Sequence, residues 1–200
     1  MKIEKDKKEV RFLSENFRAV DNTDNEMVIE GYAVVFDKPA THGFTEVIQK
    51  TAFNKCDMSD VPLKYNHNNS HLIIARTRNK SLQLIIDDVG LKVRAKLIDT
   101  QSNLDVYKSI KAGLIDKMSF AFIVGDDEWD LKTDTRTIKS IEKLLDVSVV
   151  DTPFYDSTSI YARALDSLES EKKKLENLKE QREITRKKTQ LKIKLIREEK

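Results

Sequence analysis

The stretch that decides the fold is an apolar run containing one hydroxyl, Lys117-Met118-Ser119-Phe120-Ala121-Phe122-Ile123-Val124. Successive side chains of a β-strand point to opposite faces of the sheet. One face therefore carries the bulky residues of a core, which are Met118, Phe120, Phe122 and Val124. Ser119 shares the other face with Ala121 and Ile123, and the small side chain of Ala121 leaves room above the hydroxyl. The pattern predicts a buried strand whose serine is either bonded to a neighbouring carbonyl or a nucleophile.

The sequence around this run predicts a mainly antiparallel β-domain. Further strands are expected at residues 10–13, 27–36, 61–65, 81–87, 91–98, 135–141 and 144–150. Alternating apolar residues on both sides of Asp88-Val89-Gly90 predict a hairpin. Gly31 lies inside a strand-like run, which indicates a bulge or a close approach of another backbone.

Helices and turns are expected between these strands. Apolar spacing favours a short helix over residues 46–55, through Val47, Ile48, Ala52 and Phe53. Ser102 is the predicted N-cap of a second helix, which Gly113 closes. Residues 125–130 are acidic and are expected to form a turn, and Pro153 is expected in a loop.

Composition limits the class of protein. The chain has 200 residues, 39% of them hydrophobic and 35% charged, which predicts one domain with a polar appendage. A formal net charge of +2 gives no strong footprint for nucleic acid or membrane. The single cysteine, Cys56, excludes an internal disulfide and fits a reducing compartment. No apolar run reaches the length of a membrane span, and the charged residues 1–10 lack the core of a signal peptide. A soluble, cytoplasmic protein is expected.

The character of the sequence changes near Arg163, which predicts a domain over residues 1–163 and a tail over residues 164–200. The tail contains no glycine or proline and is dominated by lysine, arginine and glutamate. A partial heptad stripe is formed by Leu165, Leu168, Leu175 and Leu178. We therefore expect one long, charged helix that needs a partner. A basic arm for nucleic acid competes with this interpretation, but the interleaved acidic residues favour a solvated helix face.

Three polar residues from separate segments suit one chemistry. His67 follows a predicted strand in a polar loop, and Asp146 lies in an apolar strand where its charge needs a partner. A serine hydroxyl such as that of Ser119 becomes a good nucleophile when a histidine takes its proton. A carboxylate then fixes the histidine tautomer and stabilises the imidazolium. These residues are far apart in the sequence, so only the fold can bring them together.

Several ordered blocks of this sequence resemble the prohead protease family of tailed phages, whose members mature the capsid. The blocks are Glu30-Gly31-Tyr32-Ala33-Val34-Val35-Phe36-Asp37, Asn66-His67, Arg76-Thr77, Gly90-Leu91, Met118-Ser119-Phe120-Ala121-Phe122 and Asp146-Val147-Ser148-Val149-Val150-Asp151-Thr152-Pro153. The resemblance covers about residues 10–163. It implies a herpesvirus-assemblin-like α+β fold, a small β-barrel with flanking helices. It also implies His67 as the base and Ser119 as the nucleophile, with Asp146 where the family usually carries glutamate.

The sequence departs from the family pattern at three positions. Asp146 is one methylene shorter than glutamate, and Ala121 and Ala75 replace glycines that are usual in the family. None of these changes removes a reacting group. The resemblance further implies two backbone N–H groups that stabilise the oxyanion. Arg76 is either a neighbour of that oxyanion or a surface arginine.

The resemblance also implies the partners and the location. The expected substrates are the major capsid protein, the scaffold protein and the enzyme itself, inside the assembling procapsid in the host cytoplasm. No cofactor and no metal are expected. Likeness to assemblin raises dimerisation as a way of activating the enzyme. The tail over residues 164–200 is expected to dock the protein on the scaffold. Removal of the tail by self-cleavage is a further expectation.

Other interpretations of the same residues stay open. A non-enzymatic assembly protein with a helical arm would suit the tail and would make Ser119 a structural residue. His67 and His71 have the spacing of two metal ligands on a helix, but the intervening asparagines favour a loop and no third ligand is evident. Cys56 is better interpreted as an inert thiol than as a nucleophile. His42 is assigned to a loop.

Overall fold

The computed structural model describes residues 8–13, 17–20, 26–41, 44–151 and 158–198. One sheet has the strand order β1 (Lys8–Leu13), β10 (Lys117–Asp130), β11 (Thr135–Val150), β5 (Thr45–Ile48) and β4 (Ala40–Thr41). In the same sheet, β6 (Pro62–Tyr65) also pairs with β11, and β7 (Ala75–Arg76) pairs with β6. The second sheet has the order β2 (Arg18–Val20), β3 (Val28–Val35), β9 (Gly90–Lys96) and β8 (Leu82–Ile86). The helices are a 3-10 turn at Lys50–Phe53, α1 (Gln101–Lys111) and α2 (Thr158–Glu198).

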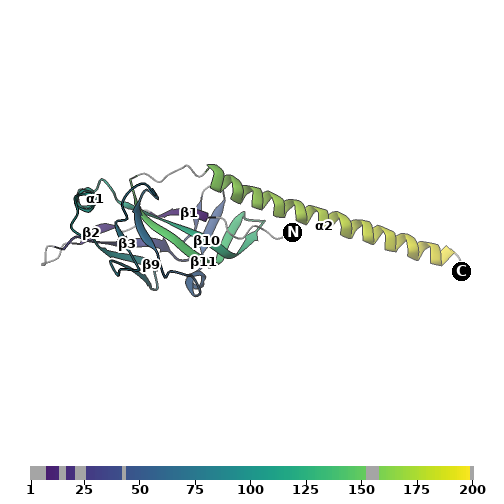
Figure 1. Ribbon diagram of the computed structural model, residues 1–200. Helices are drawn as coiled ribbons and strands as arrows, with labels where there is room; N and C mark the ends of the chain where they lie inside the picture. The colour runs from purple at the N-terminus through teal and green to yellow at the C-terminus, as the bar shows by residue number, and fades with distance from the viewer. Residues whose placement is uncertain (1–7, 14–16, 21–25, 42–43, 152–157, 199–200) are drawn as a thin grey trace.

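The two sheets pack on one hydrophobic core (Figure 1). Ile29 and Val93 of the second sheet belong to the same buried cluster as Phe120 and Leu144 of the first. The predicted small barrel is wrong. Among the strands that the structure describes, one sheet ends at β1 and β4 and the other at β2 and β8, so neither closes on itself. The fold is a mixed α+β arrangement of two open sheets.

A long antiparallel ribbon, β10 with β11, forms the centre of the first sheet. The predicted turn at residues 125–130 is wrong, because β10 continues through it. Cross-strand ion pairs of Asp127 with Arg136 and of Glu128 with Lys139 support the acidic residues there. The two strands predicted at residues 135–141 and 144–150 are one strand. Its register shifts against β10 between them, so a β-bulge replaces the expected break.

Two local predictions about helices need correction. The predicted helix at residues 46–55 is instead strand β5 followed by the 3-10 turn. Residues Thr45–Ile48 of β5 pair in parallel with β11. The apolar run is too short for its spacing to distinguish a strand from a helix. In α1 the N-cap is Thr100, whose side chain accepts a hydrogen bond from the Asn103 N–H, and Ser102 lies inside the helix.

Other local predictions are confirmed. The hairpin forms between β8 and β9, with Leu82 opposite Ala95 and Ile86 opposite Leu91. At Gly31 the backbone of another segment approaches closely, because a Cβ atom there would lie 2.8 Å from the Cα atom of Phe17. Predictions for His42 and Pro153 lie outside the described residues.

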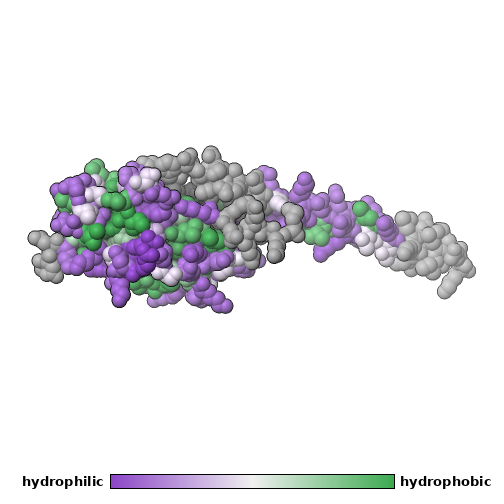
Figure 2. All heavy atoms as spheres, in the orientation of Figure 1, coloured by the Kyte–Doolittle hydropathy of each residue, from purple (hydrophilic) through white to green (hydrophobic). Residues whose placement is uncertain are grey.

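Helix α2 extends away from the sheets (Figure 1). Near its start Leu168 is buried, and Lys172 forms an ion pair of 2.7 Å with Asp134 in the turn between β10 and β11. Farther along, the described part of the helix surface is mostly hydrophilic, with isolated apolar residues (Figure 2). Neither helix in the described part of the chain combines the length and apolar character of a membrane span.

A buried network of charges joins four strands of the first sheet. Glu46 on β5 binds the guanidinium groups of Arg11 on β1 and Arg136 on β11. Glu9 bridges the same two arginines at 2.6 and 2.7 Å, and Asp127 on β10 accepts from Arg136 at 2.6 Å. Although burial disfavours the charged form, hydrogen bonds and positive charge from Arg136 and Arg11 lower the pKa of Glu9 overall. The network therefore fixes β1, β5, β10 and β11 relative to one another.

Replacing Glu46 by alanine is expected to destabilise the protein by about 3–5 kcal/mol, because it leaves two buried guanidinium groups short of a partner. The measurement is the free energy of unfolding from urea titrations. The control is Glu128→Ala, which removes an exposed ion pair with Lys139 and is expected to cost about 1 kcal/mol or less. Equal losses in the two variants would contradict the structural role of the network.

Candidate functional site

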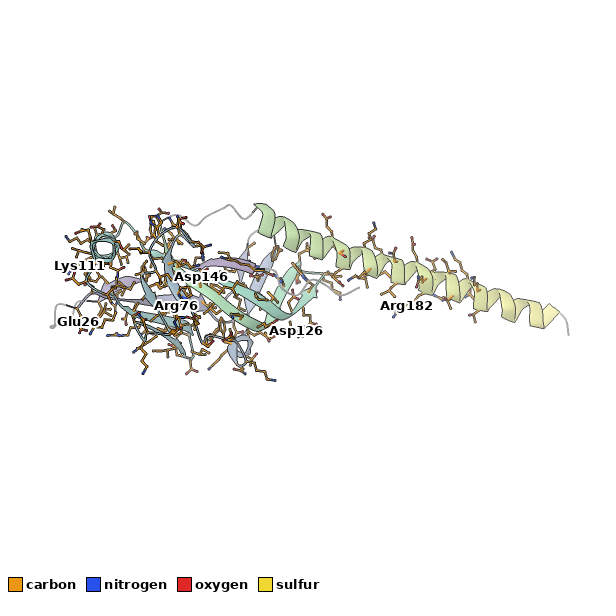
Figure 3. The ribbon with its side chains drawn as sticks, viewed as in Figure 1. Glu26, Arg76, Lys111, Asp126, Asp146 and Arg182 are labelled. Atoms are coloured by element: carbon orange, nitrogen blue, oxygen red, sulfur yellow. The ribbon has the colours of Figure 1, made fainter. Side chains whose placement is uncertain are left out.

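The pairing of β11 with both β10 and β6 brings the predicted site residues to one place. Ser119 on β10 is directly opposite Ser148 on β11, and Ala121 is opposite Asp146. These side chains share one face of the sheet. Strand β6 pairs in parallel with the same part of β11, with Tyr65 opposite Val149, and so delivers His67 to this face. Figure 3 shows Asp146 within the sheets, whereas Arg182 lies far away along α2.

His67 is held where the chain leaves β6. The Asn66 N–H still donates to the Val149 carbonyl at 3.0 Å, as the last step of the ladder. Asn66 and His67 then both adopt left-handed backbone angles, with φ of 51° and 53°, which turns the chain sharply. The His67 N–H donates to the Ser148 hydroxyl at 3.1 Å instead of to a strand carbonyl.

The three predicted residues form a hydrogen-bonded series. His67 Nδ1 contacts Asp146 Oδ1, and His67 Nε2 lies 2.5 Å from Ser119 Oγ. The Ser119 hydroxyl also lies 2.8 Å from the Arg11 carbonyl oxygen, as a donor. With Nδ1 protonated and facing the carboxylate, Nε2 is an acceptor, so the one hydroxyl proton has two acceptors within reach. The series can therefore move a proton from the hydroxyl to the imidazole.

Asp146 is a buried carboxylate with two lysines and an imidazole as neighbours. Its side chain is 1% exposed, and Lys8 Nζ and Lys64 Nζ lie 3.3 and 3.6 Å from its Oδ2. Burial raises the pKa of this carboxyl. The hydrogen bond and charge of His67, with the charges of Lys8 and Lys64, outweigh burial and lower the pKa to about 2. Asp146 is therefore ionised at neutral pH and suited to orient an imidazole.

The structure places the other candidate residues outside this series. Arg76 forms a two-point ion pair with Asp60, at 2.5 and 2.8 Å. Burial raises the pKa of the Cys56 thiol to about 12, which is unfavourable for a nucleophile. The His71 ring packs edge-on against Tyr65. In the described ranges no group of three or more His, Cys, Asp or Glu side chains is placed to hold a metal ion.

Sequence reasoning missed one member of the site, Ser148. Its hydroxyl lies 3.2 Å from both Asp146 Oδ1 and His67 Nδ1. The signal was available in the period of the strand, because Ser148 is two residues after Asp146 and therefore shares its face. A small hydroxyl residue in an apolar strand is also what a buried carboxylate needs as a hydrogen-bond donor.

A hydroxyl, an imidazole and a carboxylate in hydrogen-bonded series are the arrangement that serine hydrolases use. Comparison of the sequence with known families gives a result of the same class. The caudovirus prohead serine protease family matches residues 14–174, and the chain belongs to this family.

Individual relatives were also found. The chain is 27% identical over 148 residues to the prohead protease of Enterobacteria phage HK97. That match covers 72% of this chain and 63% of the relative, which is less than two thirds of the relative's length. Among solved structures, the bacteriophage T4 capsid assembly protease, gp21, is similar with a TM-score of 0.48 and 12% identity, over 72% of this chain and 95% of that chain.

The low pKa of Asp146 makes a prediction about stability and pH. Because the folded pKa of about 2 is below the unfolded value of about 3.9, the ionised carboxylate stabilises the fold above about pH 4. This contribution, about 2 kcal/mol, is lost as the pH falls from 4 toward 2. The variant Asp146→Asn is therefore expected to be less stable than the parent at pH 7, with the gap narrowing below pH 4.

Urea titrations at a series of pH values measure this gap. The control is Asp105→Asn, which changes an exposed carboxyl on α1 and is expected to show no such narrowing. A gap between parent and Asp146→Asn that stays constant down to the lowest pH at which both are folded would contradict the assignment.

Proposed function

We propose that this protein is a serine endopeptidase that cleaves scaffold and capsid protein segments, and itself, during maturation of a phage procapsid. The observation that carries the proposal is the placement of His67 Nε2 at 2.5 Å from Ser119 Oγ, with Asp146 on the other ring nitrogen. Membership of the prohead serine protease family and the similarity to the HK97 prohead protease support the same activity.

The proposed mechanism assigns one role to each residue. The His67 Nε2 atom takes the proton of Ser119 as Oγ forms a bond to the scissile carbonyl carbon. The imidazolium, stabilised by the Asp146 carboxylate, then gives that proton to the leaving amine as the C–N bond breaks. Water attacks the resulting acyl ester, its proton passes to Nε2, and release of the acid returns a proton to Ser119. Asp146 stays ionised throughout, which its low pKa supports.

We assign the protease domain to residues 1–163 and a docking arm to residues 164–200. Support comes from the exposure of the described middle of α2, where Leu175, Leu178 and Ile184 are accessible among charged residues. The partner proposed for the arm is the scaffold inside the procapsid. The same long arm suits the alternative function, a non-enzymatic assembly protein, so the test must separate the two.

Replacing Ser119 by alanine is expected to abolish cleavage, lowering its rate by more than about 10³-fold, because the nucleophile is removed. The parent, Ser119→Ala and the control Ser140→Ala, a serine elsewhere on β11, are expressed alone and with capsid and scaffold proteins. Intact mass is followed with time. We expect defined fragments from the parent and from Ser140→Ala, and full-length protein from Ser119→Ala. Full-length protein in all samples would favour the non-enzymatic alternative.

A chain that ends at Lys174 tests the arm. It keeps the buried Leu168 and also Lys172, which pairs with Asp134 in the turn between β10 and β11, and removes only residues beyond them. We expect several-fold less protease per procapsid, with cleavage by free protein unchanged, because the docking surface is lost and the site is not. Quantitative mass spectrometry of purified procapsids measures the ratio. Normal incorporation of the shortened chain would refute the docking role.

A further inference from the structure

We propose that Ser148 is a positioning residue whose hydroxyl holds His67 and Asp146 relative to each other and so aims the imidazole at Ser119. The inference rests on the proposed function of these three residues and adds a fourth. Ser148 is fully buried, directly opposite Ser119 across the β10–β11 pair. Its hydroxyl contacts both His67 and Asp146.

The hydroxyl of Ser148 is used in both directions. Its oxygen accepts from the His67 N–H at 3.1 Å, and its proton is donated to Asp146 Oδ1 at 3.2 Å. The one hydroxyl of Ser148 therefore holds both the main chain of His67 and the side chain of Asp146. Since a buried amide or carboxylate that loses its hydrogen-bond partner destabilises the protein, both contacts resist displacement.

The backbone of His67 is where such support is needed. The chain leaves the β6 ladder through two successive left-handed residues, Asn66 and His67, a conformation that is uncommon for residues other than glycine. After the Asn66 N–H has used the Val149 carbonyl, the His67 N–H bonds to the side-chain Oγ of Ser148, so the main chain stays attached to β11 beyond the end of the ladder. The imidazole thus leaves the sheet from an anchored main chain.

The orientation of the carboxylate is the second thing that Ser148 sets. Asp146 Oδ1 receives both the Ser148 hydroxyl and the imidazole, whereas Oδ2 faces Lys8 and Lys64. With each oxygen assigned to different donors, rotation about the last side-chain bond of Asp146 would break contacts at both. The plane of the carboxylate, and with it the ring of His67, is therefore fixed.

The test measures the reactivity of Ser119 without a protein substrate. A fluorophosphonate reagent reacts as Ser119 Oγ bonds to phosphorus, fluoride leaves, and the hydroxyl proton passes to His67. The rate of the mass increase is followed for the parent, Ser148→Ala, Ser148→Cys, Ser148→Thr and the control Ser140→Ala. Unfolding by urea is measured for each, so that reactivity is compared only between folded proteins.

We expect Ser148→Ala and Ser148→Cys to react on the order of 10–100-fold more slowly than the parent, because a small misplacement of the base costs this much. Ser148→Thr keeps the hydroxyl and is expected to recover most of the rate. Ser140→Ala is expected to react like the parent. The downfield proton resonance of the His67 Nδ1–H shared with Asp146 should broaden in the alanine and cysteine variants and persist in the threonine variant.

Different results overturn different claims. If folded Ser148→Ala and Ser148→Cys react at the parental rate and keep the downfield resonance, Ser148 does not position the base. If Ser148→Ala, Ser148→Cys and Ser148→Thr all lose both stability and reactivity, the role of Ser148 is structural only. If the parent itself is not modified at Ser119, the proposed function fails, whatever the variants show.

Discussion

The register of β10 against β11 is the constraint on which the rest of the structure depends. Ser119 opposite Ser148, and Ala121 opposite Asp146, place two hydroxyls and a carboxylate on one face. A slip of one residue in β10 would turn Ser119 to the other face and expose the aromatic core residues instead. Burial of Phe120 and Phe122 on the opposite face therefore also specifies the position of Ser119, the proposed nucleophile. Core packing and the site are two consequences of one alignment.

The buried charge of Asp146 shapes the surroundings of this alignment. A carboxylate that is 1% exposed requires compensation, and it receives it from three different segments, through Lys8 of β1, Lys64 of β6 and His67. Each of these groups is thereby drawn toward β11. The attraction between Asp146 and these groups offsets the desolvation of the carboxylate. It also holds His67 beside Asp146, as the proposed site requires.

Predictions from the sequence succeeded where local pattern decides the structure. The buried serine strand, the β8–β9 hairpin and the close approach at Gly31 all follow from short-range rules. They failed where a distant partner decides. Residues Thr45–Ile48 form a strand because β11 is available to pair with them, and the acidic residues of β10 stay extended because Arg136 and Lys139 face them. The strand period places Ser148 on the face of Asp146, but its contact with His67 depends on the turn after β6, which the local pattern does not show.

Arg11 joins the stability of the sheet to the chemistry of Ser119. Its guanidinium lies in the buried network with Glu46 and over the ring of Phe122, while its carbonyl oxygen accepts from the Ser119 hydroxyl at 2.8 Å. The Arg11 carbonyl oxygen and His67 Nε2 compete for the one hydroxyl proton of Ser119. Transfer of that proton to the imidazole is therefore favoured only while the imidazole stays close to the hydroxyl. Because the ion network sets where β1 lies, it also sets the distance of the competing acceptor. In the proposed mechanism, the balance between a resting and a reactive Ser119 hydroxyl is therefore determined partly by charges on the opposite face of the sheet.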